Sequence, residues 1–469
     1  MKDPRKIGLL CALWLLLVLL WLAVMIELTT LVSYHNFFTA GELFAWVTAN
    51  GYETGDIAQY CMRYVWLYWV LWSLVCATGA WFIWRCVHIG NMKRIYLCVG
   101  IEIALLFPFT ILPFPSNIVR ESIYVRQQIR NIRNHQNDSQ SFTYKAYKRS
   151  SIEKQEVYVL AIGESVRYAN WSLDGTYPRK TAPHLEQQSN LYLYSDYYAN
   201  ATLTQHALPM LFTPVTTDSF NDHFHYKTIA AAFAEAGFRT ALVSHRAQLM
   251  NNEYHNYLAQ DFDTVLFVAH DSLIASAVAN LAKHTPELFV VTHYLGNHMF
   301  YTNRTTDCLV WHPDYNADPK AKSDSLFLNA YDNSLLYSDK LLNDALVELD
   351  SAKVVCSWIF VSDHGEYISS KVSGHGYTYH PTRDEYHVPL MTWYSDEYAE
   401  AYPEKVANMY RHKDNPLCAD HVFWSVLDMA GIRIDSTLQQ EGMSIFGDTL
   451  LPHQRTLLLP DGKSIMNLD

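Results

Sequence analysis

The chain has 469 residues, half of them hydrophobic, and a formal net charge of −12. The negative charge excludes a nucleic-acid-binding protein as the default interpretation. It also requires that any anionic substrate be held by a local site rather than by the overall field. Eight cysteines do not indicate a disulfide scaffold, because most lie in or beside apolar N-terminal runs. Only Cys308, Cys356 and Cys418 belong to the remainder of the chain, so at most one disulfide can form there.

Apolar runs near the N-terminus predict a membrane domain over residues 1–115. The runs at 7–26 and 64–84 contain no charge, and the run at 95–115 is interrupted only by Glu102. Each has the roughly 20 residues that a helix needs to cross about 30 Å of hydrocarbon. The first run is too long for a signal-peptide core and is not followed by a small-residue cleavage site. We therefore predict three transmembrane helices, in which Glu102 is either functional or, more simply, reaches the membrane interface.

The basic residues predict how these helices are oriented. They lie before the first run and around the connection between the second and third, at Lys2, Arg5, Lys6, Arg85, Lys93 and Arg94. The loop at 33–62 contains no Lys or Arg. The positive-inside rule therefore places the N-terminus in the cytoplasm and everything after residue 115 on the other side of the membrane.

Residues 116–150 are predicted to form an interfacial helix and a linker. Arginines alternate with isoleucines at Arg120, Ile123, Arg126, Ile129, Arg130, Ile132 and Arg133. This pattern suits a helix that lies on the membrane surface, although a solvated amphipathic connector explains it equally well. The polar stretch at 134–150, rich in Asn, Gln and Ser, follows as the linker.

From residue 151 to 469 the pattern becomes that of one globular domain. Apolar, β-rich runs occur at 157–163, 240–245, 264–269, 288–294, 354–363 and 388–394. Helical patterns lie between them at 228–236, 272–283, 326–349 and 419–430. Strands that alternate with helices predict an α/β fold with a mixed, mainly parallel sheet covered by helices.

Polar residues follow three of these strands at the point where each ends. They are Glu164, His293, His298, Asp363, His364 and, slightly later, His375. Ligands of parallel sheets bind just beyond the carboxyl ends of the strands. Taken singly, such an Asp is commonly a helix cap and such a His a hydrogen-bonded core residue. Taken together, carboxylates and imidazoles at one edge predict a site for Zn²⁺, with Mn²⁺ as the alternative.

The motifs at these strand ends resemble those of a known family. Ser-Asp-His-Gly-Glu at 362–366 and HYLGNH at 293–298 are similar to motifs of the alkaline phosphatase/sulfatase superfamily. More narrowly, the chain resembles the membrane phosphoethanolamine transferases of Gram-negative bacteria. The matching stretches are GESVRYANWSLDGTYPRKTAPHL (163–185), NATLTQHALPMLF (200–212), NAYDNSLLYSD (329–339), SDHGE (362–366) and EYHVPLMTW (385–393). The likeness covers about 157–395, whereas the N-terminal spans are similar only in kind and fewer in number.

The resemblance implies a threonine nucleophile. Family members use a metal-bound Thr a few residues before a Pro, at the start of a helix. Thr204, five residues before Pro209, fits this position, and Thr202 is the near alternative. A divalent cation can activate a threonine hydroxyl, and a helix N-terminus favours phosphoryl oxygens. Without the resemblance, both threonines are equally well explained as a helix cap and a helix residue.

The resemblance also implies roles for the other polar residues. The family's zinc ligands match Glu164, Thr204, Asp363 and His364. Its substrate-side histidines match His298 and His375, while His293 matches a motif histidine of less clear role and His380 is a spare imidazole. Two departures indicate a divergent branch. Tyr-Ile-Ser-Ser follows SDHGE where the family has Ser-Leu-Gly-Glu, and the remaining cysteines cannot reproduce the family's disulfides.

The implied function is a metal-dependent transfer of phosphoethanolamine from phosphatidylethanolamine to a lipopolysaccharide-type acceptor, or another envelope glycan, through a phospho-threonine intermediate. Such an enzyme would be a multi-pass protein of the inner membrane with its catalytic domain in the periplasm, in contact with membrane lipid and not with nucleic acid. The alternatives are a glycerophosphotransferase, a sulfatase, and a non-enzymatic membrane protein that uses the domain for assembly. A sulfatase needs a Cys or Ser that is converted to formylglycine, and Thr204 cannot supply one.

Overall fold

The computed structural model describes part of the N-terminal region and most of the rest of the chain. The described residues are 4–34, 43, 66, 69–70, 72–74, 76–77, 79–81, 84–85, 100, 114–138, 141–149, 152–245, 257–299, 301–303, 308–314, 323–369, 374–376 and 380–469. They fall into two compact units, Met1–Gln128 and Ile129–Asp469. The larger unit contains the predicted site.

The N-terminal unit is described mainly through two helices. Helix α1 (Pro4–Tyr34) includes the first predicted span, and α5 (Phe114–Asp138), whose last residues are assigned to the larger unit, begins two residues before the predicted interfacial segment. The second and third predicted spans lie largely outside the described residues. Among the residues that are described, no helix combines the length and the hydropathy needed to cross a membrane. The three-span topology and the membrane contact of α5 therefore stay predictions.

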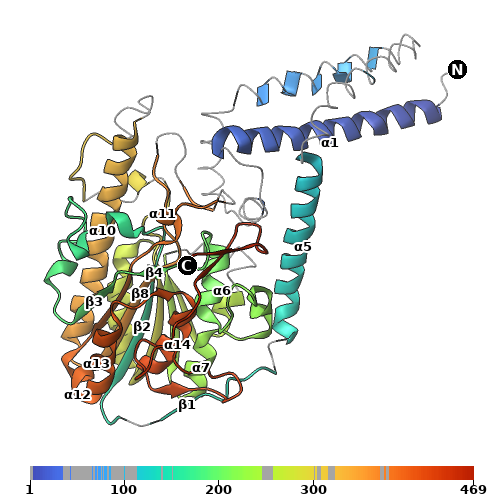
Figure 1. Ribbon diagram of the computed structural model, residues 1–469. Helices are drawn as coiled ribbons and strands as arrows, with labels where there is room; N and C mark the ends of the chain where they lie inside the picture. The colour runs from blue at the N-terminus through green and yellow to red at the C-terminus, as the bar shows by residue number, and fades with distance from the viewer. Residues whose placement is uncertain are drawn as a thin grey trace. The chain divides into compact units, whose positions relative to one another are not determined.

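The C-terminal unit is built on a sheet of seven strands (Figure 1). The strands are β2 (Glu156–Gly163), β3 (Leu191–Tyr194), β5 (Arg239–Ser244), β6 (Thr264–Phe267), β7 (Glu287–His293), β8 (Val355–Ser362) and β9 (Leu390–Tyr394). Their order across the sheet is β3-β9-β8-β2-β7-β5-β6. The five strands from β8 to β6 are mutually parallel, whereas β9 runs antiparallel to both β8 and β3. The sheet is thus mixed and mainly parallel, as predicted.

The central strands are buried on both faces. Every residue of β2 and of β8 is buried, which explains why these strands are continuous apolar runs rather than alternating ones. Each of the six predicted strands is present, with boundaries that differ by a few residues. Strand β3 was not predicted, because its sequence LYLY is short and most of its residues are only half-buried.

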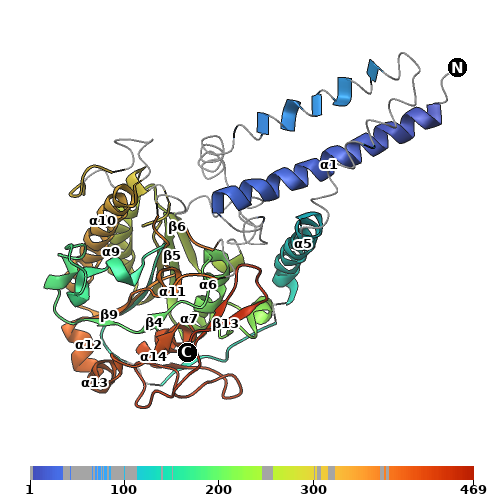
Figure 2. The same cartoon turned by 45° about the horizontal axis from the view of Figure 1, so that its top comes forward.

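Helices cover the two faces of the sheet in separate groups (Figures 1 and 2). The helices of this unit are α6 (Thr204–Phe212), α7 (Ile229–Glu235), α9 (Ile274–His284), α10 (Asp324–Ser351), α11 (Arg383–Tyr386), α12 (Asp396–Ala401), α13 (Pro403–His412) and α14 (Asp420–Met429). On one face, α9 and α10 pack against alternate residues of β2, such as Val157 and Val159. On the other, Phe233 of α7 stacks on Phe289 of β7, with 3.8 Å between ring centroids.

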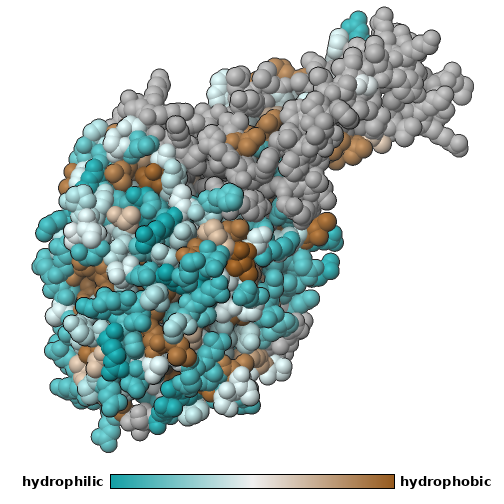
Figure 3. Space-filling view, viewed as in Figure 1, coloured by the Kyte–Doolittle hydropathy of each residue, from teal (hydrophilic) through white to brown (hydrophobic). Residues whose placement is uncertain are grey.

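Short strands complete the unit. They form three pairs: β1 (Tyr147–Lys148) with β11 (Ile432–Arg433), β4 (Tyr197–Tyr198) with β10 (Leu417–Cys418), and β12 (Thr456–Leu458) with β13 (Ile465–Asn467). The face of this unit seen in Figure 3 is mainly hydrophilic, with small hydrophobic patches. Cys308, Cys356 and Cys418 are all free thiols.

Candidate metal and nucleophile site

The carboxyl ends of β2 and β8 place three of the predicted ligands side by side. The two strands are parallel neighbours in which Gly163 lies opposite Ser362. The next residues of each chain segment, Glu164 on one side and Asp363 and His364 on the other, therefore leave the sheet at the same point. All three side chains are at most 1% exposed. Buried carboxylates of this kind are paired with cations or bind metals.

Thr204 meets these three residues from another element. It is the first residue of α6. Its Oγ1 lies 2.6 Å from Asp363 Oδ2, 3.3 Å from Glu164 Oε2 and 3.2 Å from His364 Nε2. Four groups that are distant in the sequence thus converge on one point.

The separations between these atoms fit a zinc ion. Ligand atoms of a tetrahedral zinc site lie about 2.0–2.1 Å from the ion, and so roughly 3.3–3.4 Å from one another. His364 Nε2 is 3.4 Å from both Glu164 Oε1 and Asp363 Oδ2, and two of the three Thr204 distances are 3.2 and 3.3 Å. Of these five separations only the one between Thr204 and Asp363 is shorter, and Glu164 presents Oε1 to His364 and Oε2 to Thr204. Two carboxylates, one imidazole and one hydroxyl are also a suitable ligand set for Zn²⁺ or Mn²⁺.

The electrostatics of the site favour a positive charge. Burial lowers the pKa of His364, but the adjacent carboxylates of Asp363 and Glu164 outweigh this effect, so that its pKa is raised overall. In a protein, a divalent cation can take the place of that proton. Because a ligating imidazole must be neutral, metal binding would release the proton from His364.

Backbone hydrogen bonds fix which atoms face the site. Asp363 Oδ1 accepts from the backbone N–H groups of Ser165, at 3.2 Å, and His364, at 2.8 Å, which leaves Oδ2 for Thr204. His364 Nδ1 lies 2.9 Å from the carbonyl oxygen of Gly365. Because a carbonyl only accepts, Nδ1 must donate, so that in the neutral ring the lone pair is on Nε2 at the site.

Ser165, whose backbone has an unusual conformation, holds the Glu164 side chain in place. Its Oγ donates to Glu164 Oε1 at 2.9 Å, and its φ is +58°. A residue other than glycine in the left-handed region is strained, and such strain is concentrated at functional sites. Sequence reasoning did not select Ser165, since a serine after a strand end gives no signal of this role.

Position 365 has to be a glycine, because the backbone of another segment passes very close to it. A Cβ on this residue would lie 2.0 Å from the carbonyl oxygen of Asp384, and the Gly365 N–H is bonded to the carbonyl of Glu385 at 2.9 Å. We expect Gly365→Ala to displace His364, to weaken zinc binding, and to lower the free energy of unfolding by roughly 1–3 kcal/mol. Zinc titration together with denaturant unfolding checks this. Unchanged values for both quantities would contradict the close approach.

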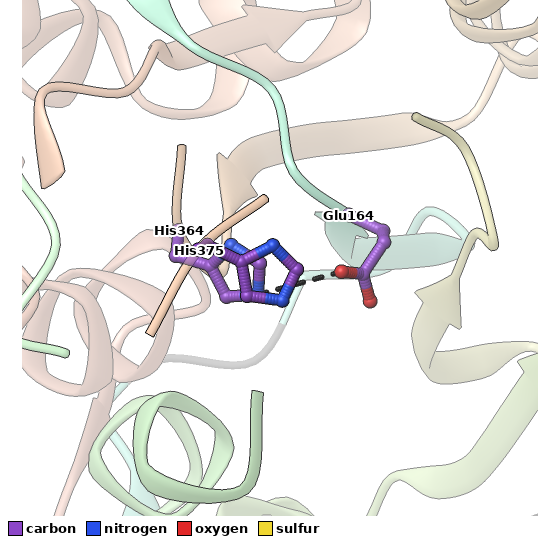
Figure 4. A group of neighbouring side chains, drawn as sticks. All are labelled: Glu164, His364 and His375. Atoms are coloured by element: carbon purple, nitrogen blue, oxygen red, sulfur yellow. Dashed lines mark ion pairs between the residues drawn. The ribbon is translucent and has the colours of Figure 1, made fainter. Parts of the chain in front are cut away.

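His298 and His375, which the resemblance places on the substrate side, lie beside this centre. Figure 4 shows His375 next to His364, whose ion pair with Glu164 is dashed. The two imidazole centroids are 3.7 Å apart, and that of His298 is 6.3 Å from His375. Glu164, His364 and His375 can also be grouped as metal ligands, since one ligand atom of each lies within 4.8 Å of the others.

The remaining predicted histidines are placed as follows. His293 is the buried last residue of β7, opposite Ile162 and Ser244. His380 is exposed. The structure adds Glu366 and Tyr301, which sequence reasoning did not assign. Glu366 is within the quoted SDHGE motif, whereas nothing in the sequence around Tyr301 indicates its contact with the site.

A second cluster, of Cys418, Asp420 and His453, has ligand atoms within 4.8 Å of one another. Hydrogen bonds explain why these three side chains lie close together. Asp420 accepts from Asn200 Nδ2 at 2.6 Å and is paired with His453 Nε2 at 2.7 Å. The cluster thus fixes the segment that leads to Thr204.

Comparison with known proteins agrees with this architecture. The Sulfatase family model matches residues 156–432. A Kdo(2)-lipid A phosphoethanolamine 7''-transferase from Salmonella typhimurium is 26% identical over 291 residues, which cover 59% of this chain and 50% of that relative. The chain therefore spans half the length of that relative.

Solved structures show the same fold. Integral membrane lipooligosaccharide phosphoethanolamine transferase A (EptA) from Neisseria meningitidis matches with a TM-score of 0.67 and 17% identity, over 90% of this chain and 86% of that one. The C-terminal periplasmic domain of EptC from Escherichia coli, in complex with Zn, matches with a TM-score of 0.60 and 19% identity, over 69% of this chain and 95% of that one. The resemblance seen in the motifs is confirmed, and the chain belongs to the Sulfatase family within the alkaline phosphatase/sulfatase superfamily.

Proposed function

We propose that this protein transfers phosphoethanolamine from phosphatidylethanolamine to a lipopolysaccharide-type acceptor, through a covalent intermediate on Thr204. The observation that supports this best is the position of the Thr204 hydroxyl. It lies at the start of α6 and within 2.6–3.3 Å of a carboxylate of Asp363, a carboxylate of Glu164 and an imidazole nitrogen of His364. A hydroxyl that is surrounded by two carboxylates and an imidazole is better explained as a nucleophile than as a helix cap.

Zinc is the cation that we propose for the site, with Mn²⁺ as the alternative. Glu164, Thr204, Asp363 and His364 would hold it. When bound, the ion lowers the pKa of the Thr204 hydroxyl and offsets negative charge on the phosphoryl oxygens. The Zn complex of the EptC domain from Escherichia coli supports this choice, because that domain has the same fold.

Two displacement steps follow from the arrangement. In the first, Thr204 Oγ forms a bond to phosphorus, the bond from phosphorus to the diacylglycerol oxygen breaks, and the hydroxyl proton ends on that oxygen. In the second, an oxygen of the acceptor forms a bond to the same phosphorus, the bond from phosphorus to Thr204 Oγ breaks, and the proton of the attacking acceptor group ends on Thr204 Oγ. The N-terminus of α6 favours the negatively charged phosphoryl group in both steps, and phosphoryl transfer depends mainly on such positioning and charge stabilisation.

The acceptor is chosen from the names of the relatives. The relative from Salmonella typhimurium is named as acting on Kdo(2)-lipid A, and EptA is named as acting on lipooligosaccharide. By analogy we propose a lipopolysaccharide-type acceptor for this chain. A lipid donor also suits the predicted inner-membrane anchor and periplasmic catalytic domain.

The test uses the full chain in zinc-containing vesicles of either phosphatidylethanolamine or phosphatidylglycerol, with a lipopolysaccharide acceptor. We expect release of diacylglycerol and addition of phosphoethanolamine to the acceptor, seen by lipid and glycan mass spectrometry, and only from phosphatidylethanolamine. Cells with and without the gene should differ in the same modification. Transfer from phosphatidylglycerol alone would replace this proposal with a glycerophosphotransferase, and no transfer from either lipid would favour a non-enzymatic role.

A further inference from the structure

We propose that Glu366, held in place by Tyr301, is a positioning residue that fixes the ring of His375 so that Nε2 faces the Thr204 site. The inference rests on the proposed function and assigns a role to two residues outside the predicted ligand set. Glu366 is fully buried, and both of its carboxylate oxygens have a partner. Oε1 accepts from the hydroxyl of Tyr301, and Oε2 lies 2.6 Å from Nδ1 of His375.

The backbone places His375 opposite Glu366. Tyr367 and Gly374 form a two-way bridge, in which each N–H donates to the other residue's carbonyl at 2.9 Å. Their neighbours, Glu366 and His375, are thereby brought together across the bridge. Glu366 is itself fixed, since its N–H donates to the carbonyl of Asp384 at 3.1 Å. The pairing is thus a consequence of the fold and not of a chance side-chain rotamer.

Tyr301 also links Glu366 and His375 to the residues that hold Glu164, a proposed metal ligand, in place. Its ring meets that of Tyr331 edge-on, at 5.2 Å between centroids. The hydroxyl of Tyr331 in turn donates to the carbonyl of Ser165 at 2.7 Å, and Ser165 donates to Glu164. One contiguous set of contacts therefore fixes both Glu164 and His375.

The hydrogen bond to Glu366 has a chemical consequence. A carboxylate only accepts, so Nδ1 of His375 donates and Nε2 has the lone pair. One ring nitrogen of His375 lies within 4.8 Å of ligand atoms of Glu164 and His364. Because Nδ1 is engaged by Glu366, we assign the accepting role to Nε2, which can take a hydrogen bond from the attacking hydroxyl of the acceptor and orient it toward the phosphoryl group.

Burial raises the pKa of Glu366 to about 8, and the hydrogen bond from Tyr301 and the charge of His364 only partly offset this effect. A divalent cation held by the neighbouring ligands would lower this pKa and so favour the carboxylate that accepts from His375.

The first test needs no catalytic activity. In the full chain labelled with ¹⁵N-histidine, the His375 signal is assigned by its loss in His375→Asn, and its nitrogen shifts report the tautomer. We expect the Nδ1–H tautomer in the wild type and a loss of this preference in Glu366→Leu, which removes the acceptor at similar volume. An Nε2–H tautomer in the wild type, or an unchanged one in Glu366→Leu, would overturn the assignment whether or not the protein transfers phosphoethanolamine.

The second test is a mutant cycle on the transfer rate. We expect Glu366→Gln to lower kcat by roughly 10–100-fold, as is typical for partners of functional histidines, and Tyr301→Phe to lower it less. Neither change should have a further effect in a His375→Ala background, because both residues act through His375. Equal losses in the two backgrounds would contradict the proposal. Tyr168→Phe is the matched control, since it removes a hydroxyl that donates to another carboxylate, that of Asp174 at 2.7 Å.

Discussion

Thr204→Ala is expected to abolish phosphoethanolamine transfer, lowering kcat by at least about 10³-fold, because removal of a covalent nucleophile leaves only binding and electrostatic effects. The Thr204 hydroxyl lies within 2.6–3.3 Å of Asp363, Glu164 and His364. Rates measured in the vesicle assay, with zinc content determined on the same preparations, check this expectation.

Two further variants make the Thr204 result specific. Thr204→Ser should retain part of the activity, since a serine hydroxyl can occupy the same position. Thr202→Ala should be close to wild type, because the Thr202 side chain is buried and its hydroxyl has no hydrogen-bond partner among the described residues. Near wild-type transfer by Thr204→Ala, or a loss in Thr202→Ala alone, would show that the wrong threonine has been assigned.

The second large effect is expected for Asp363→Ala, which should lose bound zinc. Its carboxylate is 1% exposed and contacts both Thr204 and His364, so its removal leaves an incomplete and distorted ligand set. Zinc that binds only the folded state stabilises it by about 2.7 kcal/mol at a concentration 100 times its Kd. We therefore expect added zinc to raise the Tm of the wild type but not that of Asp363→Ala.

Asp339→Ala is the matched control for this experiment. Asp339 is a buried aspartate of α10 that accepts from the backbone N–H groups of His184 and Leu185, outside the candidate ligand set. Its replacement should lower the Tm while zinc content and the response to zinc stay intact. Full zinc occupancy in Asp363→Ala, by elemental analysis, would refute the ligand assignment.

The predictability of the fold follows from where the chain is buried. Strands such as β2 and β8 are buried on both faces, so they could be read directly from continuous apolar runs. The direction of β9 could not, because a short buried strand has the same pattern whether it pairs parallel or antiparallel. Strand β3, half-buried at the edge of the sheet, is too short and too polar in its surroundings to be distinguished from a loop.

Some residues of the candidate site could be predicted from the sequence in the same way, and others could not. Glu164, Asp363 and His364 were predicted because they directly follow strands that end at the same edge. Thr204 needed the family resemblance, because nothing local distinguishes it from Thr202. Tyr301 could not be found from the sequence, since its contact with Glu366 joins residues 65 positions apart and depends on tertiary packing.

The covalent intermediate is the most direct test of the proposed mechanism. The full chain with zinc is incubated with phosphatidylethanolamine vesicles in the absence of acceptor, quenched, digested and analysed by peptide mass spectrometry. The mechanism predicts that the peptide containing Thr202 and Thr204 gains the mass of one phosphoethanolamine group, that fragmentation places it on Thr204, and that Thr204→Ala shows none. Acceptor modification without any adduct on the enzyme, or an adduct on Thr202, would contradict it.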